Sequence, residues 1–217
     1  GEITLAHRGV LFLDEMPEFS RRSLEILRQP LEDKVIRISR VYGTYDFPAD
    51  FMLCAAMNPG PCGHYPDMNR CRCTPAQVMQ YLGRISQPLL DRLDLCAEVS
   101  PVDFEGLSSG RKGESTQTIR ERVICAQDIQ RERYKIEGIQ FNGELSGAQI
   151  EKYCKMEKDA RQLLKMAFQN MPFSARAYHR ILKVARTIAD MEATESIHRH
   201  HIAEALSYRA FDKKYWN

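Results

Sequence analysis

Two adjacent carboxylates, Asp14 and Glu15, directly follow the apolar run Val10-Leu11-Phe12-Leu13. A short unbroken apolar run predicts a strand that is buried on both faces of a parallel sheet. Because the carboxyl ends of such strands form the ligand crevice of open α/β sheets, we expect both carboxylates at the mouth of a site. Paired carboxylates suit magnesium-phosphate chemistry, in which one holds Mg²⁺ while the other orients or deprotonates an attacking water. The motif alone favours a simpler interpretation, a strand that ends in an acidic turn, and the residues downstream reverse that preference.

A second apolar run, residues 51–57, ends at Asn58-Pro59 in the way that the first run ends at Asp14. If the two strands are neighbours, the Asn58 amide lies beside the carboxylates. There it could hydrogen-bond a γ-phosphate or the attacking water without adding charge. An Asn-Pro pair is also a common turn, but in combination with the acidic motif we favour a polar-sensor role for Asn58.

Two arginines stand where a phosphate partner would explain them. Arg92 lies between acids in Asp91-Arg92-Leu93-Asp94, at a predicted helix-to-strand junction. It forms either a local salt bridge or an arginine finger that reaches a neighbouring subunit's phosphate. Arg176 falls in the first turn of a helix expected over residues 174–191, where a cation is unfavourable for the helix dipole. Further cations recur along that helix opposite its apolar stripe, as on an ordinary solvated face: Arg180, Lys183 and Arg186.

Residues 34–47 predict a β-hairpin, because apolar and polar side chains alternate on either side of a turn at residues 41–43. Lys34, Arg37 and Arg40 place three cations in this short segment. These cations leave two interpretations open, a contact with DNA phosphates or an ordinary solvated edge.

A loop rich in proline, glycine and cysteine covers residues 59–75, and it carries four potential metal ligands: Cys62, His64, Cys71 and Cys73. Clustered thiolates are good zinc ligands. The sequence leaves two interpretations open in equal measure, a structural Zn²⁺ site or free cysteines in a mobile loop. The triplet His198-x-His200-His201 also resembles a metal site, although histidines on a helix surface are far more common.

Composition limits the classes of protein. The chain has 217 residues, 43% hydrophobic and 28% charged, which is ordinary for a soluble globular protein of one large or two modest domains. A net charge of +2 provides no general attraction for a polyanion, so nucleic-acid contacts must come from local patches. The absence of a signal peptide and of a bilayer-spanning apolar run, with seven cysteines, favours a reduced cytoplasmic location without a membrane partner. The chain opens at Gly1 without an initiator Met and soon reaches its best motif, which predicts a fragment of a longer protein.

The expected organisation is an α/β domain over residues 1–104, a polar Gly/Ser-rich linker over 105–116 and a helical domain over 117–217. In the first domain, Ser20 can cap a helix that runs to about Gln29. The segment from Leu93 to Val99 is a third, weaker strand candidate, because Asp94 and Glu98 interrupt it. In the second domain, the apolar periodicity predicts helices at 116–134, 146–154, 156–170, 174–191 and 198–210.

Four stretches, in chain order, carry a resemblance to a known family: Gly1–Gly9 running into the acidic motif, Ala55–Pro59, Leu89–Leu95 and Ser174–Tyr178. Together they resemble the magnesium-chelatase-like AAA+ ATPases over nearly the whole chain. The resemblance implies an α/β P-loop NTPase (AAA+) core, incomplete at its N-terminal side, followed by an all-helical lid domain. It also implies ATP and Mg²⁺ as cofactors, and a hexameric motor that acts on DNA in recombination or natural transformation.

The same resemblance implies a role for each candidate residue. Asp14 and Glu15 would form the Walker B pair, Asn58 sensor 1, Arg92 the arginine finger and Arg176 sensor 2. Asp14 and Arg176 would contact the nucleotide. The hairpin would match one that points into the central pore of related ring helicases.

Two departures from the family pattern matter. No G-x-x-x-x-G-K-[ST] motif is present, so the phosphate-cradling loop would lie upstream of Gly1, and the missing strand before it would leave a gap in the middle of the sheet. We therefore expect this chain alone to hydrolyse no ATP. Relatives usually read Asn-Pro-Cys-Pro-Cys-Gly where this chain has Asn58-Pro59-Gly60-Pro61-Cys62-Gly63, so one cysteine is missing, and His64 could replace it.

Two other functions fit the same residues. A metal-chelatase motor subunit, in which ATP drives ion insertion into a tetrapyrrole, shares these motifs, and stimulation of ATP turnover by DNA would argue against it. A non-enzymatic zinc-loop module that binds nucleic acid would bind DNA without nucleotide and contain stoichiometric zinc.

Overall fold

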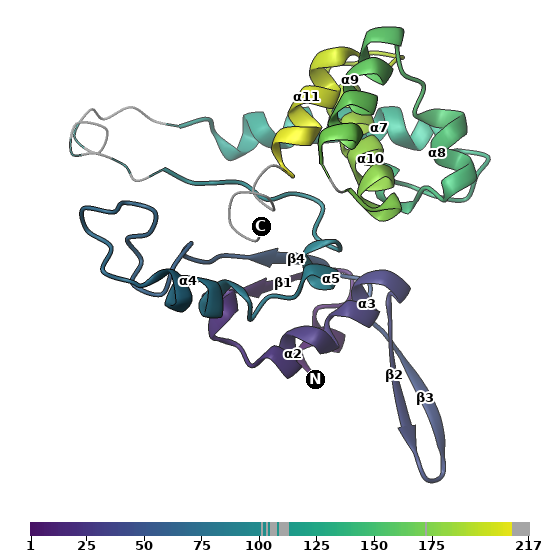
Figure 1. Ribbon diagram of the computed structural model, residues 1–217. Coiled ribbons are helices and arrows are strands. Elements are labelled where there is room, and N and C mark those ends of the chain that lie inside the picture. Colours follow the sequence, from purple (N-terminus) through teal and green to yellow (C-terminus); the bar gives the residue numbers. More distant parts are fainter. Residues whose placement is uncertain (101, 103, 105–107, 109–112, 172, 210–217) are drawn as a thin grey trace. The chain divides into compact units, whose positions relative to one another are not determined.

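The computed structural model describes the chain except for residues 101, 103, 105–107, 109–112, 172 and 210–217. The described residues form two compact units that part between Leu93 and Asp94 (Figure 1). Most of the linker expected over 105–116 lies outside the described residues, so its limits stay a prediction.

The first unit combines short helices with two small sheets. Its elements are α1 (Glu2–Leu5), β1 (Val10–Leu13), the 3-10 helix η1 (Met16–Glu18), α2 (Arg21–Ile26), α3 (Arg28–Asp33), β2 (Val35–Arg40), β3 (Gly43–Pro48), β4 (Met52–Ala55), α4 (Pro75–Leu82) and α5 (Gln87–Leu90). Mixed α/β content is what the apolar runs and helical periodicities of this half predict.

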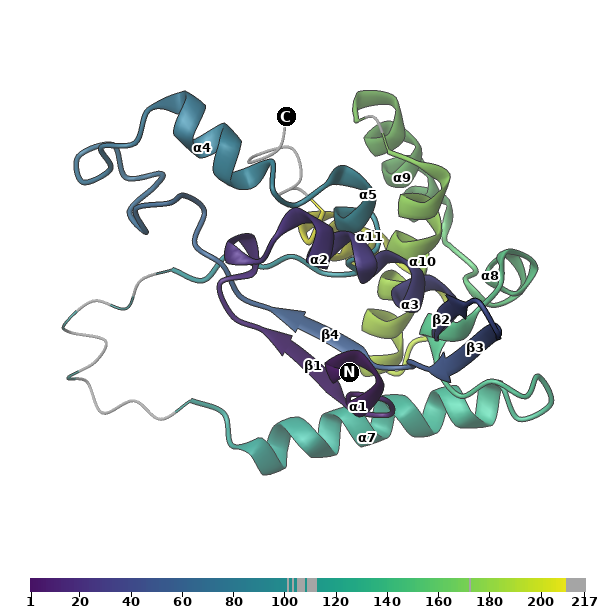
Figure 2. The same ribbon diagram turned by 90° about the horizontal axis from the view of Figure 1, so that it is seen from below.

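The central sheet of this unit pairs β1 with β4 in parallel, with Leu13 opposite Ala55 (Figure 2). The inward-facing side chains of β1 pack against a core from η1, α2 and α5: Met16, Leu24, Leu27, Ile85, Leu89 and Leu90. On the other face, Val10 and Phe12 are 54% and 58% exposed. The prediction that this strand is buried on both faces is therefore wrong for one face, because the described core packs only against the other.

The helix expected from Ser20 to Gln29 is present but divided. The Ser20 hydroxyl accepts a hydrogen bond from the Ser23 N–H at 3.1 Å, as a helix cap should. The chain then turns at Leu27 and continues as α3 to Asp33. Both Leu24 and Leu27 are buried in the core of the unit.

The prediction of a third strand at Leu93–Val99 is wrong. No strand is assigned to these residues, and the Cys96 N–H donates instead to the Tyr208 carbonyl at 3.1 Å. Asp94 and Glu98 interrupt the apolar pattern, and charged side chains cannot be buried between sheet neighbours without partners.

The predicted hairpin is confirmed. Strands β2 and β3 pair antiparallel, with Val35 opposite Pro48 and Arg40 opposite Gly43. Only Val41 and Tyr42 lie between the strands. The hairpin extends away from α3 as a thin two-stranded ribbon (Figure 1).

The second unit is helical, as predicted. It contains α7 (Thr116–Arg133), the 3-10 helix η2 (Asn142–Glu144), α8 (Gly147–Tyr153), α9 (Lys158–Asn170), α10 (Ala175–Met191) and α11 (Arg199–Ser207). Serines cap three of these helices, and Ser174 accepts a hydrogen bond from the Ala177 N–H at 3.2 Å, as its sequence position predicts.

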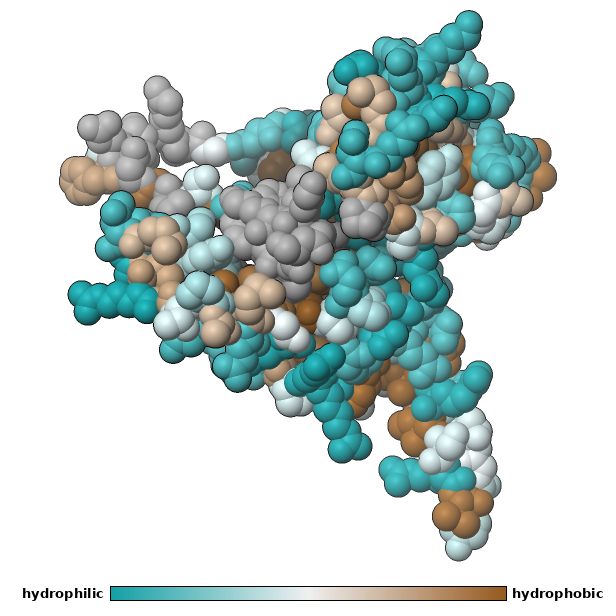
Figure 3. Space-filling view, in the orientation of Figure 1, coloured by the Kyte–Doolittle hydropathy of each residue, from teal (hydrophilic) through white to brown (hydrophobic). Residues whose placement is uncertain are grey.

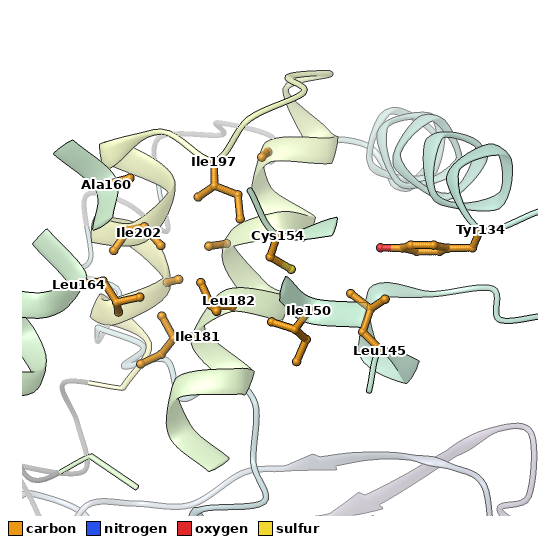
Figure 4. Close-up of a cluster of buried hydrophobic side chains, with 13 residues drawn as sticks. Tyr134, Leu145, Ile150, Cys154, Ala160, Leu164, Ile181, Leu182, Ile197 and Ile202 are labelled. Carbon is orange, nitrogen blue, oxygen red and sulfur yellow. The ribbon is translucent and has the colours of Figure 1, made fainter. Parts of the chain in front are cut away.

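The core of the second unit is built around α10 (Figure 4). The predicted apolar stripe of α10 packs against side chains from α8, α9 and α11: Ile150, Leu164 and Ile202. Tyr134 completes this core at the end of α7.

A buried charge cluster, defined here as Arg133, Asn142, Arg186 and Asp190, holds the C-terminal half of α10. Arg186 donates to Asp190 at 3.1 Å and to the Glu195 carbonyl at 2.5 Å. Arg133 and Asn142 each donate to Asp190 at 2.8 Å. The prediction that Arg186 lies on a solvated face is therefore wrong. Its guanidinium is buried, and burial is possible because a carboxylate and backbone carbonyls accept its hydrogen bonds.

Candidate functional site

Asp14 and Glu15 form a turn that interrupts the β1–β4 ladder. The Ala56 N–H donates to the Leu13 carbonyl at 2.9 Å, and the Met16 N–H donates to the Ala56 carbonyl at 3.0 Å. The two acidic residues therefore occupy a step between consecutive ladder bonds, directly at the carboxyl end of the strand. Both side chains are exposed, where a hydrated cation or a phosphate ligand can reach them.

The backbone of this turn is held in an uncommon conformation. Glu15 is left-handed, with φ 49° and ψ 47°, which costs a non-glycine residue about 1–2 kcal/mol. The Asp14 carboxylate accepts the Glu15 N–H at 3.0 Å, and the buried Met16 and Pro17 fix the chain on the far side. Strain that is supported in this way often occurs at functional sites.

Asn58 leaves the same edge of the sheet as the acidic pair. The expectation that the two strands are neighbours is confirmed, and Asn58 comes three residues after the end of β4. The following loop passes close to it, because a Cβ added to Gly63 would lie 3.9 Å from the Asn58 amide nitrogen. Sequence and topology thus bring three polar residues to the same edge of the sheet.

Arg92 is engaged within its own unit. Its Nε donates to the Arg28 carbonyl at 3.1 Å, and its Nη1 donates to the Pro88 carbonyl at 2.7 Å. A further nitrogen forms an ion pair with Glu32. The Arg92 side chain is only 10% exposed, so its guanidinium joins α3 to α5 instead of pairing with Asp91 or Asp94.

Arg84 is a cation that contacts the residues just after the acidic turn, and the sequence does not predict this contact. Its Nη1 donates to the Pro17 carbonyl at 2.9 Å and to the Glu18 carboxylate at 3.0 Å. The only sequence signal is a basic residue just beyond a helix that ends at Gly83, which is too common to be informative.

Arg176 belongs to the second unit. It lies in the first turn of α10 and is exposed. One turn further, Arg180 forms an ion pair with Asp94. The prediction that Arg176 lies in the first turn of this helix is confirmed, and its role stays a prediction.

The three hairpin cations differ in their surroundings. Arg37 makes a bidentate contact with Asp46 on the paired strand, at 2.8 and 2.9 Å, which raises the pKa of the guanidinium. Lys34 lies 3.3 Å from Asp50. Arg40 ends β2, two residues before the tip residue Tyr42, which is 94% exposed. The outer end of the hairpin includes apolar surface (Figure 3).

Three of the four expected metal ligands gather in the loop before α4. The Sγ atoms of Cys62, Cys71 and Cys73 all lie within 4.8 Å of one another, and His64 is not part of this group. The His64 backbone N–H bonds to the Cys62 sulfur and, with Cys73, lowers the pKa of that thiol to about 7. The bond to Cys62 raises the pKa of Cys73 to about 11, because a thiolate neighbour disfavours a second negative charge.

The histidine triplet forms a different kind of cluster. Nε2 of His200 and of His201 lie 2.9 and 3.0 Å from one Glu192 carboxylate oxygen. Nδ1 of the buried His201 accepts the His198 N–H at 2.9 Å, so the ring proton must be on Nε2 and points at Glu192. His201 thus caps α11 and bonds Glu192, while Glu192, His200 and His201 each place one potential ligand atom within 4.8 Å of the others.

Comparison with known proteins places the chain in a family. Residues 1–107 match the family model described as magnesium chelatase, subunit ChlI, and residues 113–209 match the model of the C-terminal part of that subunit. The chain belongs to the magnesium-chelatase ChlI family. The resemblance noted from the four sequence stretches is therefore confirmed, and the family is one of AAA+ ATPases with a helical C-terminal domain.

Individual relatives agree with this assignment. The chain is 47% identical to the competence protein ComM of Haemophilus influenzae over 97% of its own length. It is 48% and 46% identical to the YifB proteins of Salmonella typhimurium and Escherichia coli, over 98% of its length in both cases. The chain spans about two fifths of the length of these relatives, 40–41% in each case. Among the described residues, no helix is long and apolar enough to cross a membrane.

Proposed function

We propose that this chain is the Walker B, sensor and lid portion of an ATP-driven AAA+ motor that acts on DNA. The observation that carries the proposal is the parallel pairing of β1 with β4. That pairing brings the acidic pair and Asn58 to one edge of the sheet, the edge at which α/β proteins bind their ligands.

The three residues divide the work of phosphoryl transfer. Asp14 would hold Mg²⁺, for which exposed carboxylates are suitable ligands. Glu15 would orient and deprotonate the attacking water. Asn58 would hydrogen-bond the γ-phosphate or that water. Arg176 would add positive charge to the nucleotide as sensor 2.

Arg92 keeps its proposed role as an arginine finger only under a structural condition. The guanidinium has to leave the carbonyls of Arg28 and Pro88 before it can reach a neighbouring subunit's phosphate. The finger therefore requires an assembled ring, which we propose to be a hexamer, in which a neighbour's phosphate replaces the two carbonyls and the Glu32 carboxylate as partners of the guanidinium.

The hairpin supports DNA as the substrate class. A two-stranded ribbon with Arg40 and the almost fully exposed Tyr42 at its outer end presents a cation and an aromatic face together. This combination suits single-stranded nucleic acid, because the cation contacts phosphates and the ring stacks on bases. Arg37 contributes less to this surface, since Asp46 already neutralises it.

The test uses the full-length protein and measures ATP turnover with and without single-stranded DNA. We expect Glu15→Gln to bind ATP normally and to lose turnover by orders of magnitude, because the amide cannot accept a proton. The matched control is Glu18→Gln, an exposed acid three residues further along, in η1, which should keep most of the turnover. Equal turnover in wild type and Glu15→Gln would remove Glu15 from the mechanism.

The same assay separates the alternatives. A metal-chelatase motor would hydrolyse ATP without stimulation by DNA and would instead respond to the tetrapyrrole-binding subunit. A non-enzymatic nucleic-acid module would bind DNA equally well with and without nucleotide, and neither Glu15→Gln nor Glu18→Gln would change that binding.

A further inference from the structure

We propose that Cys62, Cys71 and Cys73 form a binding site for a thiophilic divalent cation, Zn²⁺ in the first place. Their Sγ atoms lie within 4.8 Å of one another, and those of Cys62 and Cys71 are 3.4 Å apart. A tetrahedral zinc with Zn–S bonds of about 2.3 Å holds its sulfurs roughly 3.8 Å apart. The three thiols are thus already spaced for one cation, with only small adjustments.

The loop brings these thiols together without a strand or helix between them. Cys71 follows a turn in which the Cys71 and Arg70 N–H groups donate to the Asp67 carbonyl at 2.8 and 3.1 Å. Cys62 lies in a second turn, closed by a 3.1 Å bond from the Gly63 N–H to the Gly60 carbonyl. Two separate turns that aim their thiols at one point, as these do, are what a metal site requires.

The third thiol is fixed from the helix side. Cys73 immediately precedes Thr74, whose side chain and Gln77 form a reciprocal capping box at the start of α4. This cap limits the freedom of the chain next to Cys73. A cation bound here would join the end of the loop to its beginning, and the loop includes Gly63, which approaches Asn58.

The chemistry of the site selects its ligand. Soft thiolates favour Zn²⁺ over Mg²⁺, whereas the carboxylates of Asp14 and Glu15 have the opposite preference. The two sites therefore take different ions. A disulfide between Cys62 and Cys71 would need a sulfur–sulfur distance of about 2.05 Å and would leave Cys73 unused.

The fourth coordination position of the cation is filled by a water molecule. Cys62 and Cys73 line a cavity of about 340 Å³ that also includes Glu18 and Arg84, so water can reach a cation held at its wall. His64 contributes its backbone N–H to the Cys62 sulfur, while its ring is outside the ligand group. The expected set is three thiolates and a water.

The first experiment measures zinc in the full-length protein, purified without chelator, by mass spectrometry of the metal. We expect wild type to hold about one equivalent more zinc per chain than either Cys62→Ser or Cys73→Ser. Cys125→Ser is the matched control, an exposed cysteine on α7, and should keep the wild-type zinc content. His64→Ala should keep it as well.

A second readout guards against a variant that fails to fold. Wild-type protein loaded with Co²⁺ in place of zinc should show a thiolate-to-cobalt charge-transfer band, and Cys62→Ser should lose part of that band while its circular dichroism stays unchanged. Equal zinc in wild type and the Cys62 and Cys73 variants, or a cobalt spectrum without thiolate bands, would overturn the site. Loss of zinc in His64→Ala would overturn the three-thiolate ligand set.

Discussion

Replacing Arg92 by alanine should destabilise the contact between α3 and α5, whatever it does to catalysis. Two hydrogen bonds from the guanidinium reach carbonyl oxygens at 2.7 and 3.1 Å, and the side chain is only 10% exposed. Bonds to charged groups contribute about 1.5–3 kcal/mol each. The ion pair with Glu32, which is 41% exposed, adds at most about 1 kcal/mol because solvent screens it. Allowing for water that rehydrates the two carbonyls, we expect a loss of about 3 kcal/mol.

Hydrogen exchange followed by mass spectrometry measures this loss locally in the full-length protein without nucleotide. Amide hydrogens of Arg28–Asp33 should exchange about 100-fold faster in Arg92→Ala, since 1.36 kcal/mol corresponds to a factor of ten. Arg84→Ala is the control, because that side chain is 45% exposed and bonds on a different side of the unit. Unchanged exchange in Arg92→Ala, together with abolished turnover, would show that the guanidinium is free in solution and would refute the structural role.

Three further predictions concern other parts of the chain. Arg40→Ala should weaken DNA binding and reduce the slope of its salt dependence by about one, and Arg37→Ala should do so less because Asp46 already pairs with it; equal slopes would contradict this. Lys152 and then Tyr153 lower the pKa of Glu137 from 4.5 to about 2, so the carboxylate stabilises the fold above pH 4.5 and loses that effect as the pH falls towards 2. The melting temperature of Glu137→Gln should therefore lie below that of wild type above pH 4.5 and converge with it near pH 2, and a constant difference would refute the linkage. Asn142→Ala should lower the free energy of unfolding of the helical unit by about 3 kcal/mol in urea titrations, because it leaves buried partners unsatisfied, whereas the exposed Asn170→Ala should change it little.

Local patterns in the sequence predicted most of the secondary structure. The helices of the second unit follow from apolar periodicity and from serine caps such as Ser174, both of which are local properties. The hairpin follows from alternation around its turn in the same way. The sequence does not say whether the strands before Asp14 and Asn58 are neighbours. The structure shows that β1 and β4 pair in parallel.

The errors come from interactions between residues that are distant in sequence. Arg186 carries the same spacing as the other cations of α10, and Asp190 together with the carbonyls of Thr194 and Glu195 makes its burial possible. The acids next to Arg92 in sequence suggest a local salt bridge as one alternative. Its hydrogen-bond partners are instead the carbonyls of Arg28 and Pro88. His64 fitted a ligand spacing, but spacing does not say whether a ring or a backbone N–H meets the thiols. The exposed face of β1 likewise depends on which elements pack there, which no single strand can specify.

The anchoring of α10 also has a mechanical meaning. This helix has 17 residues and is therefore about 25 Å long. Its C-terminal half is fixed by Arg186 and Asp190, and its first turn carries Arg176. If the helix pivots at the buried charges, a tilt of about 5° moves its first turn by about 2 Å. If Arg176 meets the nucleotide, hydrolysis at one end of the helix would pull on the loop at Thr194 and Glu195, whose carbonyls Arg186 holds at the other.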